Sequence, residues 1–97
     1  MDNLGKFEVV DILYADNGKG PYKTSKVGEK YDFRKNRTYR VYLTNAGWLD
    51  MLEINDDEEY TGFMISTTLY VNKYMDEEFV YLKTVNSIYK CLPKWRK

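Results

Sequence analysis

One hairpin pattern in the middle of the chain constrains the fold more than any other feature. Residues 38–44 alternate apolar and polar side chains, as a half-buried strand does. Residues 45–47, Asn-Ala-Gly, suit a three-residue hairpin loop with the glycine in the left-handed conformation. Residues 48–54 return as the partner strand, although Asp50 interrupts its apolar face. The apolar side chains that share a face are Tyr39, Val41 and Leu43 in the first strand and Trp48, Leu52 and Ile54 in the second.

Several other segments are rich in β-branched and aromatic residues and end at turn signals, which is typical of short strands. Residues 67–78 fit two structures: their β-branched and aromatic content favours a strand, whereas Ser66 is suited to cap a short helix. A chain of 97 residues makes one domain. We therefore predict a single mostly β domain over residues 1–97, a small antiparallel barrel of five to seven strands. The further strands are expected at residues 7–14, 30–33, 60–65, 79–85 and 88–92.

The central part of the chain carries a family resemblance. Lys26–Tyr31 reads Lys-Val-Gly-Glu-Lys-Tyr, and a polar strand, a Gly47-Trp48 return and an acidic loop leading to Tyr60 follow it. Over residues 7–66 this pattern resembles small SH3-like β-barrel modules, including short phage and Gram-positive bacterial proteins. The resemblance implies an SH3-like barrel. Peptide-binding SH3 domains carry an Ala-Leu-Tyr-Asp-Tyr-like run, which is absent here, so binding of proline-rich peptides is not carried over.

The residue types exclude several kinds of catalytic and metal-binding site. The chain has no histidine, which is the commonest general base and metal ligand. Its one cysteine, Cys91, cannot form a tetrahedral zinc site or an intramolecular disulfide. No glycine-rich phosphate loop is present, and Asp56–Glu59 reads as a solvated hairpin tip. We therefore expect no enzyme, no metal and no cofactor. The lone thiol and the polar first residues favour a cytoplasmic protein without membrane contact.

Charge is segregated along the chain although the net charge is zero. Residues 17–40 hold eight Lys or Arg against two acids, and residues 50–78 hold nine acids against one lysine. Two interpretations stay open. The blocks neutralise each other across neighbouring strands, or the fold leaves two faces of opposite sign that orient a partner.

These observations favour a non-catalytic protein-binding module. In its more specific form, a phage or mobile-element protein binds and inhibits or modulates a host protein. If Val41 and Leu43 point inward, Tyr42 lies outside beside Arg40, and aromatic residues are frequent in protein interfaces. The candidate partner-binding residues are Arg40, Tyr42, Trp48, Asp56, Asp57, Glu58, Glu59 and Tyr60.

Two alternatives remain. A nucleic-acid-binding β barrel would use basic side chains on phosphates. A self-assembling structural subunit would pair basic faces with acidic faces head to tail. The candidate nucleic-acid contacts are Lys30, Arg34, Lys35, Arg37 and Arg40.

Overall fold

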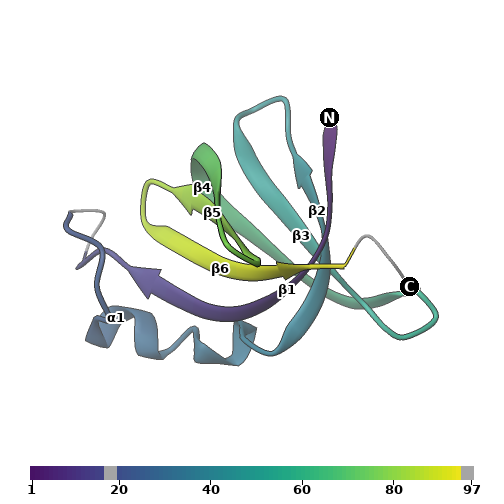
Figure 1. Ribbon diagram of the computed structural model, residues 1–97, viewed down its shortest axis with the longest axis horizontal. Coiled ribbons are helices and arrows are strands. Elements are labelled where there is room, and N and C mark those ends of the chain that lie inside the picture. Colours follow the sequence, from purple (N-terminus) through teal and green to yellow (C-terminus); the bar gives the residue numbers. More distant parts are fainter. Residues whose placement is uncertain (17–19, 95–97) are drawn as a thin grey trace.

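Six antiparallel strands form one sheet that closes into a barrel (Figure 1). The computed structural model describes residues 1–16 and 20–94. Each strand pairs with its neighbours in chain order, and β1 pairs with both β2 and β6 to complete the ring. The mostly β barrel predicted from the sequence is therefore confirmed. The strands are β1 (Asp2–Tyr14), β2 (Arg37–Leu43), β3 (Trp48–Ile54), β4 (Tyr60–Asp76), β5 (Phe79–Thr84) and β6 (Ser87–Pro93).

Two long strands, β1 and β4, close the barrel by changing partners along their length. The first part of β1 pairs with β2 and the second part with β6, with register shifts beside Gly5 and between Val9 and Asp11. In the same way β4 pairs first with β3 and then with β5, with a shift between Tyr70 and Asn72. Such irregularities bend a strand and increase its twist, which closure requires. Because β4 runs through residues 67–76, the strand interpretation of this segment is right and the helix is wrong.

The barrel interior is filled by apolar side chains from every strand. Tyr39 and Val41 of β2 are fully buried, as the alternation predicts. On β3 the buried residues are Leu49 and Met51, so the face predicted from Trp48, Leu52 and Ile54 is wrong except at Ile54. The core cluster consists of Phe7, Val9, Ile12, Tyr14, Tyr39, Val41, Leu49, Met51, Ile65, Val80, Leu82, Tyr89 and Cys91.

The Asp50 carboxylate explains which face of β3 points outward. The Asp50 carboxylate accepts hydrogen bonds from Trp48 Nε1 at 3.1 Å and from Ser66 Oγ at 2.9 Å. A carboxylate is costly to bury, so Asp50 takes the outer face and Trp48, two residues earlier, lies on the same side. Trp48 is consequently 39% exposed.

The connection between β1 and β2 is helical, so the strand predicted at residues 30–33 is wrong. It contains a short helix α1 (Lys26–Glu29) and a 3-10 helix η2 (Asp32–Arg34), which lie beside β1 (Figure 1). Ser25 begins α1, because its Oγ accepts a hydrogen bond from the Gly28 amide at 3.1 Å. Gly28 packs directly on the Tyr14 ring, where a Cβ atom would lie 2.2 Å from Tyr14 Cδ2. The segment therefore sits tightly against the end of β1.

Candidate functional site

The acidic residues predicted to bind a partner form the turn between β3 and β4. Asn55 holds this turn, because its Oδ1 accepts hydrogen bonds from the backbone amides of Asp57 at 2.9 Å and Glu59 at 3.0 Å. Glu58 has a positive φ of 63° and carries ion pairs to Lys6 at 2.9 Å and to Arg40 at 3.2 Å. The structure therefore brings Arg40 together with the acidic turn.

The aromatic residues of the predicted partner site are spread over the barrel. Tyr60 begins β4 next to the acidic turn and is exposed. Tyr42 is half-buried on β2 and pairs with Asp50 of β3. Trp48 lies at the opposite end of β3 from the acidic turn, about 20 Å away at the usual rise of a strand. These residues therefore lie in two separate areas, one around Arg40 and Glu58 and one around Trp48.

Most of the predicted nucleic-acid contacts are ion-paired within the barrel. Arg37 Nη1 lies 3.0 Å from Glu53, and Arg40 lies 3.2 Å from Glu58. Lys35 lies 3.9 Å from Asp11 and 3.7 Å from Asp32. Lys30 is exposed, with its ammonium 5.3 Å from the centre of the Tyr31 ring. Ion pairs thus neutralise three of the five candidates, Lys35, Arg37 and Arg40.

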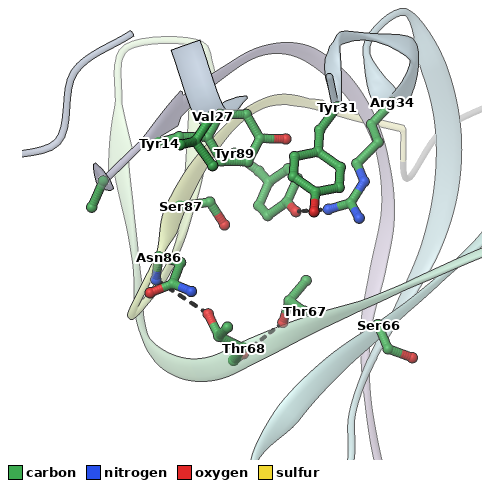
Figure 2. A pocket seen from close by; sticks show the side chains of 11 residues that line it. Tyr14, Val27, Tyr31, Arg34, Ser66, Thr67, Thr68, Asn86, Ser87 and Tyr89 are labelled. Atoms are coloured by element: carbon green, nitrogen blue, oxygen red, sulfur yellow. Dashed lines mark hydrogen bonds between the residues drawn. The ribbon is translucent and has the colours of Figure 1, made fainter. Parts of the chain in front are cut away.

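Arg34 differs from the other basic candidates because it lines a pocket at one end of the barrel. The pocket has a volume of about 300 Å³ and lies between the helical segment and strands β4 and β6 (Figure 2). Three tyrosines and Arg34 form one side, and hydroxyl side chains from β4 and β6 form the other. The side chains that matter most here are Tyr14, Tyr31, Arg34, Thr68, Ser87 and Tyr89.

The Arg34 guanidinium is held in place by aromatic groups. It stacks on the Tyr31 ring at 4.3 Å, and Nη1 donates a hydrogen bond to Tyr89 Oη at 3.0 Å. Its main-chain carbonyl accepts a hydrogen bond from the Tyr39 hydroxyl at 2.7 Å. Nε is buried and has no hydrogen-bond partner in residues 1–16 and 20–94. Within the same residues no carboxylate lies at ion-pair distance from Arg34.

Tyr14 adds a second unpartnered polar group to the same pocket. The residue is 7% exposed, and its buried hydroxyl has no partner at hydrogen-bonding geometry in the part of the chain that the structure describes. Burial raises the pKa of Tyr14, whereas the nearby positive charge of Arg34 opposes this increase. The hydroxyl therefore stays protonated at neutral pH, and it lies in the pocket wall closed to solvent.

The floor of the pocket is a satisfied hydroxyl network. Thr84 is fully buried, and its Oγ1 lies 2.8 Å from Ser87 Oγ and 3.2 Å from Thr68 Oγ1. The Tyr22 hydroxyl donates to the Thr84 carbonyl oxygen. These bonds fix the β5–β6 turn against β4. The polar groups left without partners are therefore those on the Tyr14 and Arg34 side.

Other chemistry finds little support in the described chain. Cys91 is fully buried, and burial raises the pKa of its thiol, so its reactive thiolate form is suppressed. Residues 1–16 and 20–94 contain no cluster of three or more side chains suited to hold a metal ion. No helix among them is long and apolar enough to span a membrane.

Comparisons with known proteins found no match: no family model, no curated protein and no solved structure matches this chain. The relation to SH3-like modules stays a prediction.

Proposed function

We propose that this chain is a non-catalytic protein-binding module that contacts its partner through an exposed apolar patch beside β4. The patch, called the β4 patch here, is the observation that carries the proposal. Its side chains are between 39% and 53% exposed, and exposed apolar areas on small proteins mark interaction surfaces. The β4 patch consists of Trp48, Leu69, Val71 and Val85.

The members of the β4 patch come from three strands or turns that the barrel brings together. Leu69 pairs with Trp48 of β3, and its carbonyl oxygen accepts a hydrogen bond from the Val85 amide at 2.9 Å. Val71 follows at the bulge of β4. Trp48 was among the residues that the sequence predicted for partner binding, and tryptophan is strongly enriched at interface hot spots.

Acidic residues on the same strands as the patch indicate the chemistry of the partner. Asp50 lies beside Trp48, and the β4–β5 hairpin ends in Asp76, Glu77 and Glu78. Those three hairpin residues are exposed and make no ion pair within residues 1–16 and 20–94. A complementary partner presents an apolar centre with Lys or Arg at its rim.

This charge distribution also favours protein binding over nucleic-acid binding. Nucleic-acid binding needs basic side chains that are free to reach phosphates, whereas Lys35, Arg37 and Arg40 pair with carboxylates of the barrel itself. The Lys-, Asn- and Tyr-rich composition and the resemblance to short phage-encoded barrels favour the more specific form of the proposal. In that form a phage or mobile-element protein binds and modulates a host protein.

Affinity capture with matched variants tests the proposal. The wild-type chain, Leu69→Asp and Met64→Asp are each used to capture proteins from a bacterial lysate at physiological salt. Met64 is the control, because it lies on the same strand with a similar exposed fraction, 49% against 53% for Leu69. We expect a protein that the wild type and Met64→Asp retain and that Leu69→Asp loses, with circular dichroism unchanged in all three.

Two outcomes contradict the proposal. In one, no protein is retained by the wild type, or Leu69→Asp retains the same protein equally well. In the other, the wild type binds single-stranded DNA or RNA with an affinity that falls steeply with salt, which is the behaviour of a nucleic-acid-binding protein.

A further inference from the structure

The pocket beside Arg34 has a charge balance unlike that of a second pocket near the acidic turn. No acidic residue lines it, and its one charged side chain is Arg34. The second pocket, about 260 Å³, contains Lys6 and Lys94, but these pair with Glu58 and Glu8. The first pocket therefore holds positive charge that no carboxylate at ion-pair distance balances.

Acidic residues close to the pocket do not change this conclusion. Asp32 lies on the same 3-10 helix as Arg34 and is near enough to affect the Tyr14 hydroxyl electrostatically. Its carboxylate, however, lies 3.7 Å from the Lys35 ammonium and is 57% exposed. The electrostatic environment inside the pocket is thus set by Arg34.

Arg34 is oriented to receive a ligand oxygen. Stacking on Tyr31 and the bond to Tyr89 fix the guanidinium plane, but that bond uses only one of its five N–H donors. A planar fork of N–H groups held in this way matches carboxylate and phosphate oxygens. Because the guanidinium is already ordered in the free chain, binding costs less conformational entropy.

Two buried polar atoms lie in the wall of the pocket, beneath its accessible surface. Tyr14 Oη and Arg34 Nε are the two buried side-chain polar atoms without a partner among the described residues, and both belong to this pocket. Buried polar groups in folded proteins are nearly always hydrogen-bonded, so such an exception calls for a physical explanation. Both atoms are closed to solvent, and the Tyr14 hydroxyl lies near enough to the Arg34 guanidinium to interact with it, so the two groups partly compensate each other and the contacts to a ligand fall to the Arg34 Nη groups.

We infer that the pocket binds a small ligand through a carboxylate or phosphate group, which the Arg34 guanidinium holds with donated hydrogen bonds. A volume of about 300 Å³ corresponds to the lower end of small-molecule sites, and the mouth of a β barrel is a common place for them. The remainder of the ligand contacts the Val27 side chain and the Thr68 and Ser87 side of the pocket. This site goes beyond protein binding and does not depend on it.

Titration of the whole chain with inorganic phosphate and, separately, with sodium acetate tests the inference by nuclear magnetic resonance. Sodium chloride at matched ionic strength serves as the background. We expect a saturable shift of the Arg34 Nε–H signal and of the Asn86 amide. The tighter of the two anions identifies the source of the oxyanion, a phosphate ester or a carboxylate.

Three variants separate a specific site from general charge attraction. Arg34→Gln removes the charge, and we expect about ten- to hundredfold weaker binding, since a hydrogen bond to a charged group contributes about 1.5–3 kcal/mol. Arg34→Lys keeps the positive charge but removes the planar fork of donors, and it is expected to weaken binding by several-fold. Arg37→Gln is the control, because Arg37 is paired with Glu53 outside the pocket and its loss leaves the affinity unchanged.

The inference is overturned if neither anion gives a saturable shift in wild-type protein. It is equally overturned if Arg34→Gln and Arg37→Gln weaken binding alike, because the shifts then report general attraction between charges. If Arg34→Gln does not fold, Arg34→Lys decides: unchanged affinity in that variant shows that the guanidinium fork does not hold the anion and refutes the site.

Discussion

Removal of a hydroxyl is expected to have opposite effects at two buried tyrosines. The Tyr39 hydroxyl donates to the Arg34 carbonyl oxygen at 2.7 Å, whereas the Tyr14 hydroxyl is buried without a partner in the described chain. Tyr39→Phe therefore breaks one hydrogen bond, which contributes a net stabilisation of about 1 kcal/mol. Tyr14→Phe breaks none and removes a polar atom whose burial costs about 1–3 kcal/mol. Both changes keep the ring, so neither opens a large cavity.

The expected free energies of unfolding follow directly. Tyr39→Phe lowers the free energy of unfolding by about 1 kcal/mol, and Tyr14→Phe leaves it unchanged or raises it by up to about 2 kcal/mol. Urea unfolding followed by circular dichroism measures both, with an unchanged m-value as the check that only stability has moved. With m of roughly 1.5 kcal/mol/M, a difference of about 1.5 kcal/mol separates the two midpoints by about 1 M urea. Equal destabilisation by the two substitutions refutes the reasoning, because it shows that the Tyr14 hydroxyl is hydrogen-bonded in solution.

Two further predictions use the same unfolding assay. Gly28→Ala places a methyl group 2.2 Å from the Tyr14 ring, so we expect the free energy of unfolding to fall by about 1–3 kcal/mol. The control is Lys26→Ala on the exposed side of α1, which changes that free energy by no more than about 0.5 kcal/mol. Equal urea midpoints for the two variants contradict this prediction. Burial raises the folded-state pKa of Tyr39 above 10.0 and that of Cys91 above 9.0, so the folded chain retains protons that the unfolded chain releases. The resulting stability is complete below pH 9 and is lost as the pH rises through the folded-state values, by up to about 1.4 kcal/mol per pH unit and group; a flat profile above pH 9 contradicts it.

Local patterns predicted the parts of the fold that local forces determine. The hairpin of residues 38–54 is one example, since alternation marks the strands and Gly47 adopts the expected positive φ of 103°. The inward face of β3 escaped prediction because the Asp50 carboxylate bonds to Ser66, sixteen residues away on another strand. The helical turns near Gly28 escaped for the same reason, because their position depends on packing against Tyr14 at the end of β1. Contacts between distant segments decided both.

The candidate pocket could not be predicted as a site, because its lining residues come from four separate parts of the chain. Arg34 was a candidate only as one of several cations in a basic stretch, and Tyr14 and Tyr89 read as ordinary strand residues. No spacing in the sequence connects a residue of β1 with one of β6, since their proximity results from barrel closure. The signal that distinguishes the site, a guanidinium group in a pocket that no acidic residue lines, exists only in three dimensions.

Strand pairing also explains why one cation of the basic stretch differs from its neighbours. Arg37 and Arg40 lie on β2, where the adjacent β3 and the turn after it supply Glu53 and Glu58. Lys35 lies before β2 and takes Asp11 and Asp32. Arg34 precedes them by only one to six residues, yet η2 turns it toward the barrel end, where its neighbours are aromatic rings and hydroxyl groups. A count of charges along the chain treats these four residues alike, but the fold neutralises three and leaves the fourth beside a pocket lined by aromatic and hydroxyl side chains. That difference, rather than the excess of basic residues, is the reason to look for an anion there.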